Sequence, residues 1–160
     1  MNANDHCLLY EEALTVLHSK SSSPKSIKKS LEFLRRLERH GDAPAQYGLG
    51  LAYELGHGVK QDYEEARRWL LLAANQGLAE SQFNLGLMYQ DAHGVNQNYE
   101  ETARWYRLAA NQGLADAQCN LAFMYQHGHG VNQDYEESRR LYRLAANQGF
   151  SEAKFALEQK

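Results

Sequence analysis

Apolar residues recur along this chain with helical spacing, and the pattern itself repeats every 36 residues. Ala45, Leu49 and Tyr53 stand four residues apart, which places them on one face of a helix. The same spacing returns 36 residues further on, and again after another 36. A second periodic run in each unit ends in Ala-Ala-Asn-Gln-Gly, whose closing residues are Gly77, Gly113 and Gly149. Each unit therefore predicts two helices joined by a loop.

The second helix of each unit has signals at both ends. Its predicted N-cap residues are Asp62, Asn98 and Asp134, and a glutamate follows each of them three residues later, the arrangement of a capping box. The closing glycine can adopt the left-handed conformation that terminates helices. Gly50 and Gly86 fall inside first helices, where a glycine costs about 1 kcal/mol of helix propensity. We expect a close approach of two helices to compensate at these positions.

Complete units account for most of the sequence. They span residues 43–78, 79–114 and 115–150. The second and third units are identical at 24 of 36 positions, which chance does not produce. No linker interrupts the series, so we expect one domain over residues 1–160.

The two ends of the chain carry partial copies of the unit. Residues 1–42 form a degenerate N-terminal capping hairpin, with helices at 5–20 and 26–41 and a loop at 21–24. Residues 151–160 match only a first helix and would close the stack. Terminal repeats are atypical because each covers the core on one side only. The prediction is an all-α solenoid of stacked helix-turn-helix repeats with nine helices.

The repeating motif resembles a known family. The first complete unit reads Ala-Gln-Tyr-x-Leu-Gly-x-x-Tyr, then Gly-His-Gly-Val-x-Gln-Asp-Tyr-Glu-Glu-Ala, then Trp-Leu-x-x-Ala-Ala-Asn-Gln-Gly. This pattern is similar to the Sel-1-like repeat, a slightly longer relative of the tetratricopeptide repeat, strongly over 43–150 and weakly at both ends. The resemblance implies a right-handed helical solenoid that serves as an adaptor or scaffold in protein complexes, without catalysis. Some secreted bacterial members staple each repeat with a cysteine pair, and this sequence has no such pairs.

The face of the first helices opposite the packing face is the candidate partner surface. Successive residues turn by about 100° in a helix. On this basis one face of the first unit gathers Pro44, Tyr47, Leu51, Glu54 and Leu55. First helices line the concave surface of solenoids, and these positions resemble those with which tetratricopeptide-like repeats contact ligands. The candidate partner-binding residues are Tyr47, Leu51, Glu54, Glu80, Phe83, Leu87, Gln90, Asp91, Asp116, Phe123, Gln126, His127, Glu152 and Phe155.

This candidate groove combines an apolar floor with charge of one sign. Its charged residues are all acidic, with no Lys or Arg among them. A partner protein or peptide with apolar anchors and basic residues would suit it, and the acidic charge would speed encounter more than it adds affinity. Two alternatives stay open. The first is that the apolar side chains only pack against neighbouring repeats. The second is that the acidic side chains are ordinary solvated surface.

Composition excludes several classes of protein. The chain has 160 residues, a net charge of −3 and a pI near 6.2, which argues against nucleic-acid binding. Two cysteines, Cys7 and Cys119, cannot build a framework of several disulfides and fit a reducing cytoplasm, although a single bridge stays open. No secretory signal opens the chain, and no stretch approaches the roughly 18 apolar residues of a membrane span. We therefore expect a soluble cytoplasmic protein that contacts no membrane.

Histidines in register invite a metal interpretation, which the spacing disfavours. His57, His93 and His129 occur once per repeat, and adjacent repeats stack about 10 Å apart. Zinc ligands lie within about 2.1 Å of one ion, so a single metal cannot bridge this register. His127 lies close to His129, but no acidic or cysteine partner accompanies the pair. Cys119 replaces an aromatic residue of the groove and is interpreted as an apolar filler. We predict no metal, no cofactor and no catalytic residue.

Two functional settings fit this sequence. The first is an adaptor or scaffold that binds a partner through the concave groove with micromolar, exchangeable affinity. The alternative is an immunity protein that binds and neutralises a cognate bacterial toxin, such as a basic nuclease acting in the cytoplasm, with near-nanomolar affinity. Small Sel-1-like proteins found beside secreted toxins motivate this alternative, and an acidic groove would suit a basic enzyme.

Overall fold

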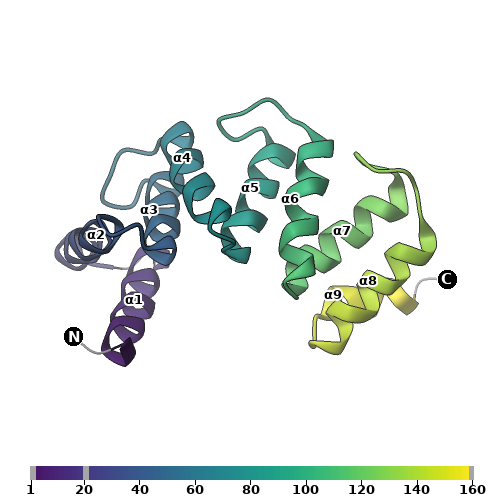
Figure 1. The fold of residues 1–160 in the computed structure, drawn as a ribbon, viewed down its shortest axis with the longest axis horizontal. Coiled ribbons are helices and arrows are strands. Elements are labelled where there is room, and N and C mark those ends of the chain that lie inside the picture. Colours follow the sequence, from purple (N-terminus) through teal and green to yellow (C-terminus); the bar gives the residue numbers. More distant parts are fainter. Residues whose placement is uncertain (1–2, 20–21, 159–160) are drawn as a thin grey trace. The chain divides into compact units, whose positions relative to one another are not determined.

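The computed structural model describes residues 3–19 and 22–158, which form an all-helical fold (Figure 1). The nine helices of this part of the chain are α1 (Ala3–His18), α2 (Pro24–Glu38), α3 (Ala43–Leu55), α4 (Tyr63–Asn75), α5 (Ala79–Asp91), α6 (Tyr99–Asn111), α7 (Ala115–His127), α8 (Tyr135–Asn147) and α9 (Ser151–Glu158). The predicted helix at 5–20 is α1, and residue 20 lies outside the described residues, as do residues 21, 159 and 160. The all-α prediction is confirmed.

The loop before α2 is shorter than predicted. Pro24 is the first residue of α2, and the Ser23 hydroxyl caps the helix by accepting the Ser26 N–H at 3.1 Å. Proline suits the first helical position because its fixed φ is already helical and its missing N–H would have no partner there. The predicted loop residue therefore belongs to the helix.

The helices group into two compact units, one ending at Leu78 and one beginning at Ala79. In the first unit α1 packs against α2 and α3, α2 packs against α3, and α3 pairs with α4. In the second unit each helix from α5 to α9 packs against the next in sequence. Figure 1 shows the paired helices of each repeat side by side. The organisation of the whole chain as a single solenoid stays a prediction.

The core of the first unit joins the degenerate N-terminal hairpin to the first complete repeat. Leu17 of α1, Leu34 of α2 and Leu49 of α3 are fully buried in one cluster. Phe33 and Trp69 occupy equivalent positions in α2 and α4, and both pack partly buried against this cluster. The hairpin therefore packs as a repeat, as its alignment predicts.

Small residues inside the first helices allow the close approach that the sequence predicts. A Cβ atom at Gly50 would lie 2.8 Å from Leu70 Cγ, and one at Gly86 would lie 2.4 Å from the Tyr106 ring. Such distances are shorter than any ordinary carbon contact, so only glycine fits without a shift. Tyr106 is fully buried and belongs to the core of the second unit.

The N-caps of the second helices confirm half of the predicted capping box. Asp62 Oδ1 accepts the backbone N–H groups of Glu64 and Glu65 at 3.0 and 3.1 Å. The Asp62 N–H donates instead to the Tyr53 carbonyl oxygen at 3.0 Å, and the Glu65 carboxylate pairs with Arg68 at 2.6 Å. The reciprocal role predicted for the glutamate is wrong because the loop already returns the cap N–H to the first helix. Equivalent bonds recur at Asn98 and Asp134.

The Asn-Gln-Gly motif ends each second helix, and in α4 and α8 its glutamine also bonds to the closing glycine of the preceding repeat. Gly149 has φ of 93°, and Phe150 N–H donates to the Ala145 carbonyl oxygen at 3.2 Å, as a left-handed cap requires. Gln148 Nε2 donates to the Gly113 carbonyl oxygen and to Gln118 Oε1, both at 2.9 Å. Matching amide pairs are Gln76 with Gln46 and Gln112 with Gln82, each at 2.8 Å. A pair formed by one buried and one exposed glutamine therefore joins the two helices of each complete repeat, a role that sequence spacing did not reveal.

Candidate partner-binding surface

The candidate residues of α3 lie in the first unit and are mostly covered. Tyr47 and Glu54 are half-buried. Leu51 is only 5% exposed, so it offers a partner little surface. On this helix the structure favours the packing alternative for the apolar positions.

The candidate residues of α5 lie in the second unit and serve its packing. Phe83 and Leu87 pack partly buried against the core of this unit. The Phe83 ring stacks on Tyr106, with ring centroids 5.4 Å apart and planes at 27°. Gln90 Oε1 accepts a hydrogen bond from the Tyr106 hydroxyl at 3.0 Å. On this helix only the acidic positions, Glu80 and Asp91, are exposed.

The candidate residues of α7 and α9 provide the apolar surface that remains. Phe123 is 48% exposed and Phe155 is 62% exposed. The acidic side chains on these helices, Asp116 and Glu152, are exposed too, as is His127. Gln126 is half-buried, and its Oε1 accepts the Tyr142 hydroxyl at 3.3 Å. The candidate surface of the second unit is therefore made by α7 and α9 together with the acids of α5.

Aromatic rings gather at the C-terminal end of α7. The Phe123 ring lies 4.1 Å from His127 and 5.8 Å from His129, measured between centroids. His129 stacks on Tyr99, the first residue of α6, at 5.6 Å. The His127 Nδ1–H donates to the Phe123 carbonyl oxygen at 2.9 Å, which orients that imidazole. Sequence reasoning placed Phe123 and His127 on the surface but missed Tyr99 and His129.

A signal for these two residues existed in the repeat itself. Tyr99 and His129 each recur once per unit, and Gly130 follows the histidine. A Cβ atom at Gly130 would lie 2.1 Å from the Tyr99 carbonyl oxygen, so the glycine lets the loop rest on the first turn of α6. In the first unit the equivalent histidine, His57, instead hydrogen-bonds through Nδ1 to the Leu17 carbonyl oxygen. In the first and third repeats this histidine therefore contacts a neighbouring helix from the loop.

Burial raises the pKa of two side chains of the second unit, Cys119 and Tyr142. Burial, with a smaller contribution from the carboxylates of Glu152 and Asp116, raises the pKa of the Cys119 thiol to about 11. A thiol with so high a pKa stays protonated at neutral pH and is a poor nucleophile. Burial also raises the pKa of the Tyr142 phenol to about 12, so its hydroxyl stays a hydrogen-bond donor to Gln126. Cys119 therefore acts as the apolar filler that the sequence indicates.

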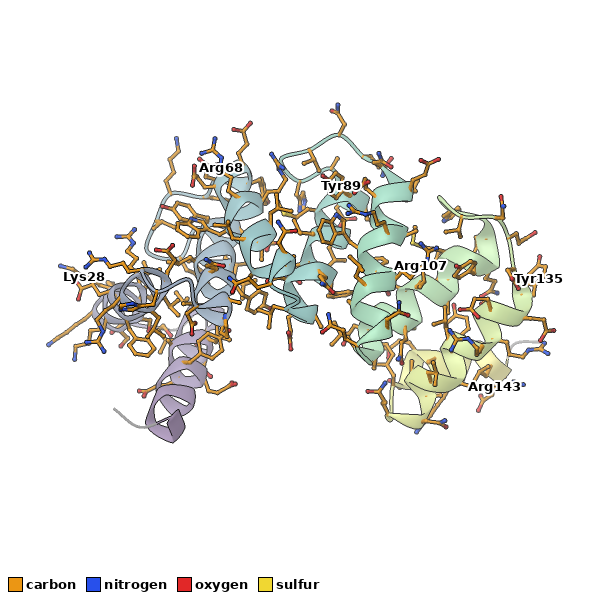
Figure 2. The ribbon with its side chains drawn as sticks, in the orientation of Figure 1. Lys28, Arg68, Tyr89, Arg107, Tyr135 and Arg143 are labelled. Atoms are coloured by element: carbon orange, nitrogen blue, oxygen red, sulfur yellow. The ribbon has the colours of Figure 1, made fainter. Side chains whose placement is uncertain are left out.

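The arginines of the second unit lie on its second helices, α6 and α8. Arg107 projects from α6 (Figure 2), and its guanidinium donates to the Tyr125 hydroxyl at 3.0 Å and lies over that ring, 5.9 Å from the centroid. Tyr135 and Arg143 project from α8 (Figure 2) and line one pocket with residues of α9. Stacking of a guanidinium on an aromatic ring is thus already used inside this unit.

Over the described residues the chain offers neither a cluster of metal ligands nor a helix that could span a membrane. No group of three or more His, Cys, Asp or Glu side chains there could hold a metal ion. None of the helices in residues 3–19 and 22–158 is long and apolar enough to cross a membrane.

Comparison with known proteins identifies the repeat. The Sel1 repeat family matches residues 43–78, 79–114 and 115–150, the three units read from the sequence. Comparison with curated protein sequences finds no match. Among solved structures, the Sel1 repeat protein from Oxalobacter formigenes is 37% identical, with a TM-score of 0.77 over 82% of this chain and 99% of that one.

Two further structures share the fold. The protective antigen c5321 of uropathogenic Escherichia coli, which displays an SLR fold, is 42% identical with a TM-score of 0.78. That alignment covers 80% of this chain, which spans only 27% of that protein's length. Helicobacter pylori cysteine rich protein B is 16% identical, with a TM-score of 0.66 over 87% of this chain and 100% of that one, a likeness of fold alone. The chain thus belongs to the Sel1 repeat family of tetratricopeptide-like helical repeat proteins.

Proposed function

We propose that this chain is a non-catalytic interaction module that acts as an adaptor or scaffold and binds a partner protein or peptide through the exposed face of its first helices. Sel1 repeat proteins generally serve protein interaction, which supports the class of function. The observation that carries the proposal is the pair of exposed rings, Phe123 on α7 and Phe155 on α9. Exposed aromatic side chains are enriched at protein interfaces and dominate their energetics.

Charge supports a basic partner. The exposed acids among the candidate positions of the second unit are Glu80, Asp91, Asp116 and Glu152. None of the fourteen candidate positions carries Lys or Arg. A partner with apolar anchors beside basic residues would bury the rings and meet charge of the opposite sign. This charge pattern would act chiefly on the rate of association, so the rate should fall as salt is added.

A capture experiment tests the proposal. The intact chain and a Phe123→Ala/Phe155→Ala variant are used to capture proteins from the native cell extract, which are then identified by mass spectrometry. We expect one stoichiometric partner of the wild type to be lost with the variant. Leu108→Ala/Leu144→Ala is the matched control, because both leucines are exposed but lie on second helices. A partner retained by the Phe123→Ala/Phe155→Ala variant, or lost with the control as well, would refute this surface.

The captured partner also separates the adaptor from the immunity protein. An adaptor should bind with micromolar affinity and leave the partner's own activity unchanged. An immunity protein should bind with near-nanomolar affinity and abolish the toxicity of a partner that is lethal when expressed alone. Measuring the affinity of the purified pair, together with growth of cells that express the partner with and without this chain, decides between the two.

A further inference from the structure

The ring cluster of the second unit borders a pocket of defined composition. Tyr99, Phe123 and His129 line a cavity of about 340 Å³. Its other lining residues are Gln90, Asp91, Gln97, Asn120 and Met124. Asp91 is the charged residue of this lining, and none of the described residues that line it is Lys or Arg. The pocket therefore combines π faces with a carboxylate and carries no fixed positive charge.

The walls of this pocket are held in place by hydrogen bonds within the second unit. Gln97 Nε2 donates to the Gln90 carbonyl oxygen at 2.8 Å, which joins the loop to the end of α5. Gln90 Oε1 is held in turn by the Tyr106 hydroxyl at 3.0 Å. Tyr99 stacks on His129 at 5.6 Å, which fixes the facing wall. A preformed site loses little conformational entropy when it binds.

The pocket is lined equally by the second and third repeats, and its Phe123 wall departs from the repeat pattern. Phe123 stands where the earlier repeats have Leu51 and Leu87, and His127 stands where they have Leu55 and Asp91. An aromatic residue at this position is therefore a departure from the two earlier repeats. Tyr99 and Phe123 are 40% and 48% exposed, so both rings offer surface to a ligand. Exposed apolar side chains that gather in one patch mark an interaction site or a ligand-binding groove.

A cation is the ligand that this chemistry favours. Aromatic faces attract ammonium and guanidinium groups through the ring quadrupole, and the Asp91 carboxylate adds attraction of the same sign. A guanidinium suits stacked rings better than an ammonium does, because it is planar and more weakly hydrated. We propose that the pocket lined by Tyr99, Phe123, His129 and Asp91 receives an arginine side chain of the partner. This assignment rests on the proposed function, since it specifies the partner that the same surface binds.

The test uses a ligand that needs no identified partner. N-acetyl-arginine amide is titrated into the full-length chain, and the ring signals of Tyr99, Phe123 and His129 are followed by NMR. N-acetyl-citrulline amide is the control probe, because it has nearly the same shape without the charge. We expect the arginine probe to shift these ring signals and the citrulline probe to leave them unmoved. Equal shifts with both probes, or no shift with the arginine probe, would overturn the assignment.

Matched variants separate the ring face from mere apolar contact. Phe123→Leu restores the residue of the two earlier repeats, so the fold is retained while one π face is removed. We expect it to weaken binding of the arginine probe about fivefold, the equivalent of about 1 kcal/mol. Asp91→Asn should weaken the binding as well. Tyr135→Ala is the control: Tyr135 occupies the position of Tyr99 one repeat later and does not line this pocket, so its loss should change nothing. Unchanged binding in Phe123→Leu, or an equal loss in Tyr135→Ala, would overturn the proposal.

The outcome distinguishes this inference from the proposed function. A protein partner captured through Phe123 and Phe155, combined with no response to the arginine probe, removes the arginine pocket and leaves the interaction module. Binding of the arginine probe with no captured partner keeps the arginine pocket and removes the proposed interaction module.

Discussion

Two phenylalanines of the candidate surface should differ sharply in what they contribute to stability. Phe83 packs partly buried against the core of the second unit and stacks on Tyr106 at 5.4 Å. Replacing a fully buried Phe by Ala costs about 3–5 kcal/mol, of which an aromatic pair supplies roughly 1 kcal/mol. Because Phe83 is only partly buried, we expect Phe83→Ala to lower the free energy of unfolding by about 2 kcal/mol. Phe123 is 48% exposed, so Phe123→Ala should cost less than about 1 kcal/mol.

Urea unfolding followed by circular dichroism at 222 nm, a wavelength that reports helix, measures this difference. With a slope of about 2 kcal/mol per molar urea, Phe83→Ala should lower the unfolding midpoint by about 1 M and Phe123→Ala by less than half of that. Phe123→Leu is the control for volume and should be almost neutral. Equal shifts for the two alanine variants would refute the reasoning, because the two rings would then be buried alike. Binding losses of Phe83→Ala are therefore interpretable only after its stability is known.

Three further perturbations test the packing and the chemistry of the second unit. Gly86→Ala places a methyl group 2.4 Å from the Tyr106 ring, so the thermal midpoint should fall by the equivalent of about 1–3 kcal/mol although helix propensity improves. Gln148→Ala removes the amide donor to buried Gln118, and urea unfolding should show a loss of about 1–3 kcal/mol. Burial raises the pKa of Cys119 from 9.0 to about 11. Alkylation of Cys119 by iodoacetamide at pH 8 should therefore be about a hundredfold slower than alkylation of an ordinary thiol, and it should accelerate as the pH approaches 11. Peptide mass spectrometry measures the rate. A rapidly alkylated Cys119, or a stable Gly86→Ala or Gln148→Ala variant, would contradict the burial on which these expectations rest.

Helical periodicity predicted the elements well but could not say which apolar face a neighbour covers. Both faces of the first helices carry apolar residues, and their spacing in sequence is the same whether they meet solvent or a second helix. The structure covers Leu51 and partly covers Phe83 while it leaves Phe123 and Phe155 exposed. The position shared by Leu51 and Phe123, and the position shared by Phe83 and Phe155, therefore have different surroundings in different repeats. Contacts between helices, and not the pattern within one helix, decide which of these side chains are exposed.

Hydrogen-bonding partners were harder to predict than helix ends. Asp62 was identified as an N-cap because the cap bond joins residues two and three positions apart. The role of Glu65 was missed because the Asp62 N–H was already taken by the Tyr53 carbonyl oxygen, on the other side of the loop. The pairing of Gln148 with Gln118 spans 30 residues, which no local rule anticipates.

By itself the sequence determined the repeat boundaries, the two helices of each complete unit, their caps and the glycines at which helices approach closely. These features depend on residues within one or two turns of each other, so spacing and residue type suffice to predict them. The tertiary structure alone decided which apolar side chains are core, paired the glutamines of the two helices within each repeat and brought Tyr99 and His129 beside Phe123. Each of these depends on how one helix or loop packs on the next, where a neighbouring backbone, and not the local pattern, sets the surroundings of a side chain.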